Sequence, residues 1–291
     1  MLGRFLEVDR LRNLMIYLFG KDIPGRSISV LPDDTFIVSH PRSGNTWTRF
    51  LIANLLHPDE TVSFANIERF VPDTTSLPRK AFRTIARPRV IKSHEYFDLR
   101  YGRVIYIVRD PRDVALSCYQ FLKKVHVLAL DTPLEDFVSG FVKGKFDIYG
   151  TWGQNVGSWL VARYGTEGFL LLRYEDLVQD PLRELAKVAD FFGAEAPAER
   201  LARVVELSSA DHMRKLEARE ADAWVLTSKT RKDIPFVGKA VAGGWKSSLS
   251  GSSVAEIEST WGHLMKALNY ELVTSAKTST FVAQCLPALT L

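Results

Sequence analysis

The chain has 291 residues, 46% hydrophobic and 25% charged, a composition typical of a globular protein with a sizeable core and not of a disordered or fibrous chain. The net charge of +4 suits an anionic substrate. It does not indicate a nucleic-acid partner, whose binding would require clustered basic residues. Two cysteines, Cys118 and Cys285, are too few for a disulfide framework and lack metal-ligand spacing, which favours a reducing, cytoplasmic compartment.

The N-terminal residues 1–34 are predicted to form a helix and a lead-in that belong to the domain that follows. Residues 6–19 have an amphipathic pattern, and we expect their apolar face to pack on the domain and not on a membrane. Charged residues, among them Glu7 and Asp9, interrupt the apolar run. The sequence therefore predicts neither a signal peptide nor a transmembrane segment.

Short apolar runs alternate with helical patterns over residues 35–270, the predicted main domain. The predicted strands are 35–39, 89–93, 103–108 and 168–174, and the predicted helices are 45–56, 111–124, 182–192, 198–207 and 254–268. This alternation indicates a single α/β domain whose central parallel sheet is flanked by helices. Residues 223–253 are expected to form a long loop or lid, and residues 271–291 form a tail without a clear pattern.

A loop at residues 39–47, called here the phosphate loop, lies between the first predicted strand and helix. Backbone N–H groups at a helix N-terminus carry partial positive charge and bind anions. Gly44 allows close approach of a ligand to the backbone. The side chains that add donors or charge are Arg42, Ser43, Asn45 and Thr46. The loop lacks the Gly-Lys-Ser/Thr of a nucleoside-triphosphate P-loop, which disfavours a magnesium-dependent kinase or ATPase.

A second segment, Val104-Ile-Tyr-Ile-Val-Arg-Asp-Pro-Arg-Asp-Val-Ala-Leu-Ser117, follows the same plan of strand, turn and helix start. Taken together, the two segments resemble the cytosolic-type sulfotransferases, which use 3′-phosphoadenosine 5′-phosphosulfate (PAPS). The phosphate loop is similar to the family's 5′-phosphosulfate loop, and the resemblance assigns the 3′-phosphate to Arg109 and Ser117. A fork-shaped guanidinium suits a phosphate dianion, whereas pairing of Arg109 with Asp113 is the structural alternative. The resemblance covers roughly residues 39–268 and implies a P-loop-containing, sulfotransferase-like fold.

A third segment, Lys92-Ser93-His94, ends the second predicted strand. The resemblance implies that His94 is the catalytic base and that Lys92 assists it. The carboxyl ends of parallel strands are where open α/β sheets place their chemistry, which agrees with this assignment. Glu95 follows directly and stays open as an alternative base, because some sulfotransferases use a glutamate.

Further nucleotide contacts follow only from the resemblance. Tyr174 and Ser208 are assigned to the adenine, and Trp47 is the expected stacking platform because Ala210 replaces the family's phenylalanine. Lys239 is what remains of a C-terminal Arg-Lys-Gly element whose phosphate-binding arginine is absent. Arg231 is one residue that could replace that arginine.

The phosphate loop departs from the family pattern because Arg42 stands where most members have a lysine. An arginine keeps the charge and offers bidentate contact, but it does not readily donate its proton to a leaving group. We therefore expect Arg42 to act electrostatically and not as a general acid.

The resemblance implies in-line transfer of a sulfonate from PAPS to a hydroxyl group, with adenosine 3′,5′-bisphosphate (PAP) as product and no metal. Aromatic and apolar residues in 64–78, 121–148 and 224–241 favour a small aromatic or lipid-like acceptor, although such residues usually pack a core. Trp152 and Trp159 are expected in the core. A catalytically silent nucleotide-binding member of the fold and a P-loop nucleotide kinase remain as alternatives, and so do both a monomer and a homodimer.

Overall fold

The computed structural model describes residues 28–274 except Arg79, Asp147, Ala221, Val225 and Lys239. The predicted helix at residues 6–19 and the tail beyond residue 274 lie outside the described residues. The elements in chain order are β1 (Thr35–Ser39), α2 (Asn45–Leu56), α3 (Ile67–Phe70), η1 (Ala81–Arg83), β2 (Val90–Ser93), β3 (Arg103–Val108), α4 (Pro111–Lys124), α5 (Leu134–Val142), α6 (Trp152–Arg163), β4 (Phe169–Arg173), α7 (Tyr174–Gln179), α8 (Pro181–Phe192), α9 (Ala198–Leu207), α10 (Ala210–Glu220), η2 (Gly244–Ser247) and α11 (Gly251–Ala267).

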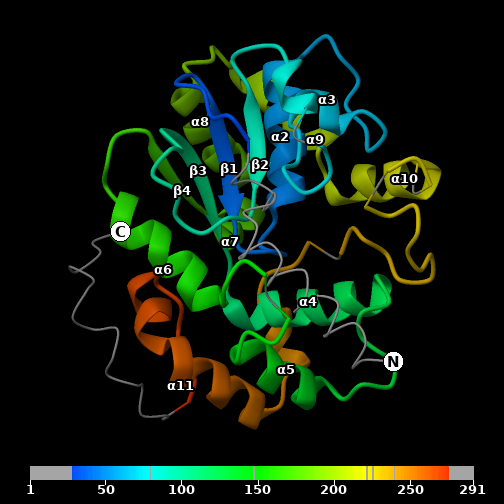
Figure 1. Ribbon diagram of the computed structural model, residues 1–291, viewed down its shortest axis with the longest axis vertical. Coiled ribbons are helices and arrows are strands. Elements are labelled where there is room, and N and C mark those ends of the chain that lie inside the picture. Colours follow the sequence, from blue (N-terminus) through cyan, green and yellow to red (C-terminus); the bar gives the residue numbers. More distant parts are fainter. Residues whose placement is uncertain are drawn as a thin grey trace.

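Four parallel strands form the central sheet in the order β2-β1-β3-β4 (Figure 1). Phe36 of β1 pairs with Ile91 of β2 on one side and with Val104 of β3 on the other. Tyr106 of β3 pairs with Leu171 of β4. Parallel neighbours need crossover connections, and the helices occupy these connections. The predicted α/β class with a central parallel sheet is confirmed.

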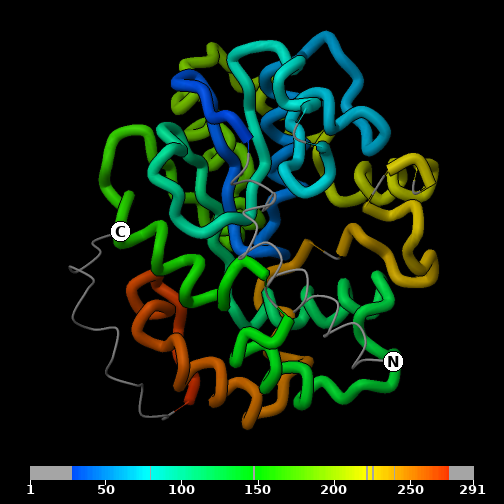
Figure 2. The backbone as a smooth tube through the Cα atoms, in the orientation of Figure 1, coloured from blue at the N-terminus to red at the C-terminus, as the bar shows by residue number. Residues whose placement is uncertain are grey.

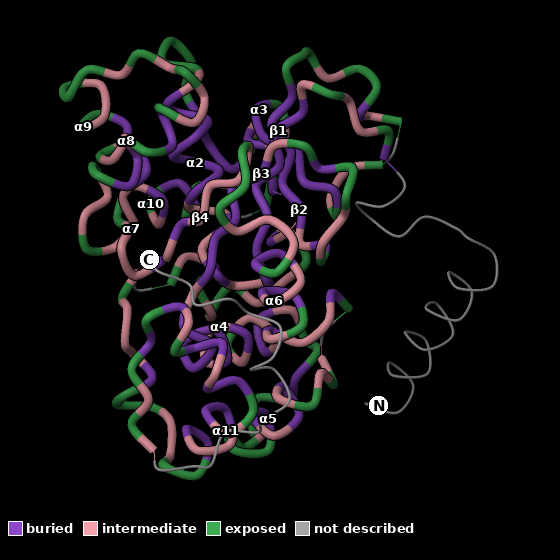
Figure 3. Tube along the Cα trace, turned by 90° about the vertical axis from the view of Figure 1, so that its left-hand side faces the viewer, coloured by how far each residue is buried: buried purple, intermediate pink, exposed green. Residues whose placement is uncertain are grey.

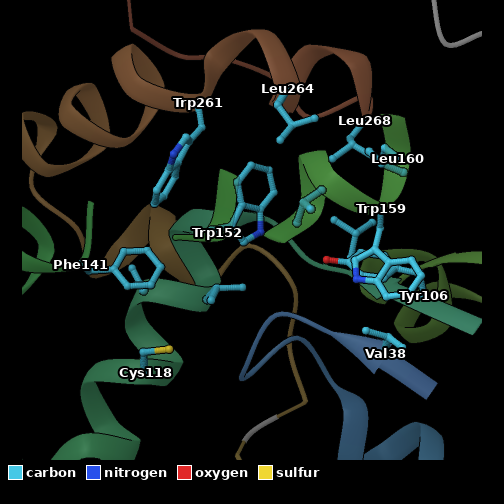
Figure 4. Close-up of a cluster of buried hydrophobic side chains, with 14 of the residues drawn as sticks. Val38, Tyr106, Cys118, Phe141, Trp152, Trp159, Leu160, Trp261, Leu264 and Leu268 are labelled. Carbon is cyan, nitrogen blue, oxygen red and sulfur yellow. The ribbon is translucent and has the colours of Figure 1, made fainter. Parts of the chain in front are cut away.

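Both faces of the sheet are covered, because successive strand residues point to opposite sides. Phe36 enters a core formed with α4, α5, α6 and α11, whereas Ile37 enters a second core formed with α2, α8, α9 and α10. β1, β2 and β3 are buried along most of their length, whereas β4, at the edge of the sheet, is mostly half-buried (Figure 3). Trp152 and Trp159 are fully buried in the first core, as predicted (Figure 4).

The four predicted strands agree with the observed ones to within one residue at each end, and the predicted helix 111–124 coincides with α4. The predicted helices do not include α3, α5, α6, α7 or α10. The last of these is strongly polar and buries only Met213, Leu216 and Glu217, so it has little apolar repeat to detect. Within the described part of the predicted loop 223–253, the only helical turn before α11 is η2, whereas residues 251–253 already belong to α11.

The carboxyl ends of the four strands bring the predicted functional residues to one edge of the sheet. The phosphate loop follows β1, His94 follows β2, Arg109 follows β3 and Tyr174 follows β4. The chain after α10, yellow to orange in Figure 2, returns to this same edge. Its return is fixed by a hydrogen bond of 3.4 Å from Nη2 of Arg42 to the carbonyl oxygen of Phe236.

Candidate active site

The phosphate loop leaves β1 at Ser39 and enters α2 at Asn45. Gly44 caps the start of α2 with a φ of 99°, a left-handed conformation that favours glycine. Nδ2 of Asn45 donates to Oγ of Ser39 at 3.1 Å, which ties the beginning of the helix to the end of the strand. Thr46 lies half-buried in the first helical turn, whose N–H groups have no partner within the helix. The loop therefore has the construction of an anion site.

Three buried donor atoms at this edge have no hydrogen-bond partner among the described residues, and the acceptor Oδ1 of Asn45 has none either. The three donors are Oγ of Ser43, Nε1 of Trp47 and Nε of Arg109. A buried donor without a partner costs free energy, so such atoms are normally explained by a ligand or an ion. Three unpartnered donors fit a ligand rich in acceptor oxygens.

Tyr174 lies against the phosphate loop and closes one side of the site. A Cβ atom added at Gly44 would lie 2.5 Å from Cδ2 of the Tyr174 ring, so the ring occupies the space that a side chain would need. The guanidinium carbon of Arg109 lies 4.1 Å from the centre of the same ring, and the Trp47 ring meets it edge-on at 5.9 Å. Tyr174, Trp47 and Arg109 are therefore brought together, as the predicted nucleotide contacts require.

Arg109 is bound mainly by backbone carbonyl groups and not by a carboxylate. Its Nη1 donates to the carbonyl oxygen of Arg42 at 3.4 Å and its Nη2 to that of Val241 at 3.2 Å. Asp113 is 4.0 Å away, at the limit of an ion pair. The Asp113 carboxylate instead accepts the N–H groups of Gly243 and Trp245 at 2.7 and 2.9 Å. The structural alternative, a close Arg109–Asp113 pair, is therefore weak.

Arg42 and Ser117 are in direct contact, because Nε of Arg42 donates to Oγ of Ser117 at 3.1 Å. Arg42, predicted to bind the 5′-phosphosulfate, and Ser117, predicted to bind the 3′-phosphate, thus lie side by side. They connect the loop after β1 to α4. Burial, with a smaller contribution from the charge of Arg109, lowers the pKa of Arg42 to about 10. Arg42 still carries its positive charge at neutral pH.

His94 is held by the backbone at the end of β2. Its Nδ1 lies 2.8 Å from the carbonyl oxygen of Ser39. Because a carbonyl oxygen only accepts, Nδ1 carries a proton, and in the neutral ring Nε2 keeps its lone pair. Burial, together with the nearby charge of Lys92, lowers the pKa of His94 well below its ordinary value. The imidazole is therefore neutral at pH 7 and able to accept a proton.

Lys92 forms a buried ion pair that the sequence did not predict. Its Nζ donates to Oδ2 of Asp73 at 2.7 Å, and both side chains are almost completely buried. Although burial alone would raise the pKa of Asp73, the charges of Lys92 and Arg49 hold it well below its ordinary range. Asp73 reaches this position because its segment runs parallel to β2, where the N–H of Lys92 donates to the carbonyl of Pro72 at 2.8 Å.

Glu95, the alternative base, has different surroundings. Nε1 of Trp159 donates to its carbonyl oxygen at 2.9 Å, on the core side of the sheet. The N–H of Glu95 donates to Oγ of Ser93 at 3.1 Å, and the residue is almost completely buried. Oγ of Ser93 lies 3.4 Å from the hydroxyl of Tyr101. The ring of Tyr101 is stacked in turn on Phe36 in the first core. Glu95 thus lies toward the core, whereas His94 lies beside the phosphate loop.

Three residues with predicted roles are not brought to the loop by any described contact. Ser208 is buried at the end of α9 and accepts a hydrogen bond from Asn54 at 3.1 Å, about two and a half turns along α2 from the loop. Arg231 pairs with Asp233 at 2.6 Å, which leaves it engaged away from Ser117. Lys239 lies outside the described residues.

The sequence missed Asp73, Phe121 and Phe236. Asp73 is 19 residues from its partner Lys92, and no spacing motif joins the two. The two phenylalanines flank Arg42, each with its ring centre 4.8 Å from the guanidinium carbon. Both belong to the segments 121–148 and 224–241, whose aromatic residues predict an acceptor pocket. Their composition does not reveal that these two rings contact Arg42.

No group of three His, Cys, Asp or Glu side chains suited to a metal ion occurs within the described ranges. In the same part of the chain, the helices are too short or too polar to cross a membrane.

Comparison with known proteins agrees with this geometry. A family model described as the sulfotransferase domain matches residues 32–269. The chain is 27% identical over 246 residues to a 3-beta-hydroxysteroid sulfotransferase of Cavia porcellus, an alignment that covers 81% of this chain and 85% of that protein. It is 28% identical over 261 residues to sulfotransferase 1A1 of Bos taurus, with 84% and 86% covered. The solved structure of mouse sulfotransferase SULT7A1 complexed with PAP has the same fold, with a TM-score of 0.67, 22% identity and coverage of 82% and 86%. The chain therefore belongs to the sulfotransferase family, and its enzyme class is that of a sulfotransferase.

Proposed function

We propose that this sulfotransferase moves a sulfonate group from PAPS to a hydroxyl group of a small molecule and releases PAP. The observation that carries the proposal is the meeting of Arg42 and Arg109 at the carboxyl edge of the sheet. Nη1 of Arg109 donates to the backbone carbonyl of Arg42 at 3.4 Å, burial and the charge of Arg109 lower the pKa of Arg42, and Asp113 is 4.0 Å from Arg109. Two adjacent cations repel each other, so a ligand with two anionic groups stabilises the arrangement. PAPS carries a 5′-phosphosulfate and a 3′-phosphate.

The residues divide into two anion sites in this proposal. Arg42, Ser43 and the N-terminus of α2 bind the 5′-phosphosulfate, and the unpartnered Oγ of Ser43 supports that role. Arg109 and Ser117 bind the 3′-phosphate, with Nε of Arg109 as a donor not used elsewhere in the described structure. Because ATP has no 3′-phosphate, the second site would distinguish PAPS from ATP.

His94 is the base in the proposed reaction. PAPS supplies the sulfonate, whose sulfur forms a bond to the acceptor oxygen while its bond to the 5′-phosphate oxygen breaks. Nε2 of His94 accepts the hydroxyl proton, and the 5′-phosphate leaves with the electrons of the broken bond. Arg42 and Lys92 stabilise the negative charge that develops on the sulfonate and leaving oxygens.

The acceptor is proposed to be an apolar alcohol or phenol. The ring of Tyr149 lies 5.6 Å from that of His94, so aromatic surface adjoins the proposed base. The name of the Cavia porcellus relative specifies a hydroxysteroid, which is an acceptor of this kind.

The test is transfer of labelled sulfonate from PAPS to a panel of phenols, sterols, fatty alcohols and sugars, together with calorimetric titration of PAP and of ATP with magnesium. We expect transfer to at least one apolar acceptor and tighter binding of PAP than of ATP. Tight PAP binding without transfer to any acceptor would favour a catalytically silent member of the fold, and preference for ATP with magnesium would favour a kinase.

A further inference from the structure

The guanidinium group of Arg42 lies against two adjoining phenylalanine rings that come from different parts of the chain. Its central carbon is 4.8 Å from the centre of the Phe121 ring and 4.8 Å from that of the Phe236 ring. The two rings are 6.2 Å apart and nearly perpendicular, at 80°. We propose that Phe121 and Phe236 are positioning residues that hold the charge of Arg42 at the donor site. The proposal rests on the function proposed above.

Phe121 belongs to the same helix face as Ser117. The two residues are four apart on α4, so both side chains reach the same side of the helix. Arg42 contacts both of them, the ring through its guanidinium plane and Ser117 Oγ through Nε at 3.1 Å. One side of the guanidinium is therefore fixed by α4.

Phe236 contacts the guanidinium from a second direction, next to Phe121 and not opposite it. Its carbonyl oxygen accepts from Nη2 of Arg42 at 3.4 Å, while its own N–H donates to Oε1 of Glu217 at 2.6 Å. Nζ of Lys124 donates to the carbonyl of Ile234 at 2.6 Å, so the segment that carries the ring is anchored on α10 and on α4. The second ring is thus held in place independently of Arg42.

Two aromatic rings hold a cation without neutralising it, which is the physical reason for the arrangement. The negative faces of the rings attract a guanidinium electrostatically. Among the described residues no carboxylate forms an ion pair with Arg42. A carboxylate partner would cancel the charge and repel an anionic donor, whereas the rings leave the full charge available to a phosphosulfate.

The pair of rings also explains why arginine is suited to this position. A guanidinium is broad, planar and weakly hydrated, so it can lie against two adjoining rings while its N–H groups donate hydrogen bonds, as those of Arg42 do to Ser117 and Phe236. The ammonium group of a lysine is compact and strongly hydrated, so it covers less ring surface and has no fixed fork of donors. The two rings therefore favour an arginine over a lysine at position 42.

The experiment is a double-mutant cycle that combines Arg42→Lys with Phe121→Leu and with Phe236→Leu, read by calorimetric titration of PAP and by kcat for sulfonate transfer. In the Arg42 background, we expect each Phe→Leu change to weaken PAP binding and to lower kcat by about three- to thirtyfold. In the Arg42→Lys background, the same changes should cost less than about twofold, because the guanidinium that they position is absent. Phe121→Tyr and Phe236→Tyr, which retain the ring, should restore most of the loss.

Phe191→Leu is the matched control. Arg103 lies over the Phe191 ring at 4.7 Å and also donates to the Phe191 carbonyl, so the contact is of the same kind but lies at the start of β3. This change should leave PAP affinity and kcat within about twofold of the wild type, since the contact is remote from the donor site. Equal losses from the Phe121 and Phe236 variants in both backgrounds would overturn the proposal, because the rings would then act through the fold or the acceptor.

An NMR measurement separates this proposal from the proposed function. The Nε–H signal of Arg42, assigned by its loss in Arg42→Lys, should be shifted by ring currents in the wild type and should move toward the position of a free arginine in either Phe→Leu variant. An Nε–H signal already at the free position in the wild type would overturn the positioning role. Failure of sulfonate transfer with a shifted signal would instead count against the proposed function alone.

Discussion

The imidazole of His94 is oriented by the backbone carbonyl of Ser39, which lies 2.8 Å from Nδ1, and not by a carboxylate. Ser39 is the last residue of β1, and His94 directly follows β2. The pairing of Val38 with Ser93 sets the register of these two strands immediately before the contact. The orientation of the proposed base is therefore built into the sheet and is coupled to the beginning of the phosphate loop.

Replacement of His94 should remove catalysis without removing nucleotide binding. His94→Ala is expected to lower kcat by about 10²–10⁴-fold, the usual contribution of a general base, with PAP affinity unchanged. Glu95→Gln is the matched variant and should retain activity, because Glu95 lies toward the core. The base assignment is wrong if Glu95→Gln removes turnover and His94→Ala does not.

The pH dependence of the reaction should reflect the lowered pKa of His94. Burial and the charge of Lys92 disfavour the imidazolium form, so the ring stays unprotonated below its ordinary pKa. We expect kcat/KM to stay level from neutral pH to below 6.5 and to fall only at lower pH. PAP binding measured across the same range serves as the control for folding. An acid limb centred at or above pH 6.5 would contradict the assignment.

The ion pair between Lys92 and Asp73 should be important for stability. Asp73→Asn leaves a buried ammonium without its counter-charge, and we expect the free energy of unfolding to fall by about 3–5 kcal/mol. Asp73→Asn combined with Lys92→Met removes both charges and should recover most of that loss, as measured by urea denaturation. The double variant should nevertheless stay nearly inactive if Lys92 stabilises the leaving group. A fully active double variant would assign Lys92 a structural role only.

Gly44 should tolerate no side chain. Gly44→Ala combines a φ of 99° with a Cβ atom 2.5 Å from the Tyr174 ring, and the strained backbone alone is expected to cost about 1–3 kcal/mol. PAP affinity should fall as well, because both the loop and Tyr174 must shift. Gly157→Ala in α6 is the control, since its Cβ would meet nothing within 4 Å and its helical position favours alanine by roughly 0.5–1 kcal/mol. Similar unfolding curves for the two variants would contradict this account.

Arg109→Ala should affect the donor and not the acceptor. Loss of a charged donor to a phosphate is expected to weaken PAP binding by about 1.5–3 kcal/mol, whereas the KM of the hydroxyl acceptor should change little. Titration of PAP and steady-state kinetics with the acceptor varied provide the comparison. If PAP affinity and the apparent affinity for the acceptor fall equally, Arg109 supports the structure of the whole site and does not bind the donor specifically.

Much of the fold is predictable from the sequence because the signals are local. The buried strands are short apolar runs, and Asp110 and Pro111 mark the start of α4 as a cap and first-turn residue, where the Asp110 side chain accepts from the N–H of Arg112 at 2.9 Å. The helix α10 escapes prediction because its sequence is polar. The helix α7 escapes because it begins at Tyr174, directly after the strand, with no separating turn.

By itself the sequence determines the α/β class, the phosphate loop and the succession of residues that follow each strand end, because these depend on neighbours along the chain. Only the tertiary structure decides what surrounds them. Arg42 contacts Phe236, which is 194 residues away along the chain. Lys92 pairs with Asp73 because the segment of Asp73 lies beside β2. Such contacts arise when crossover connections and long loops return to one edge of the sheet, and no local pattern records where they return.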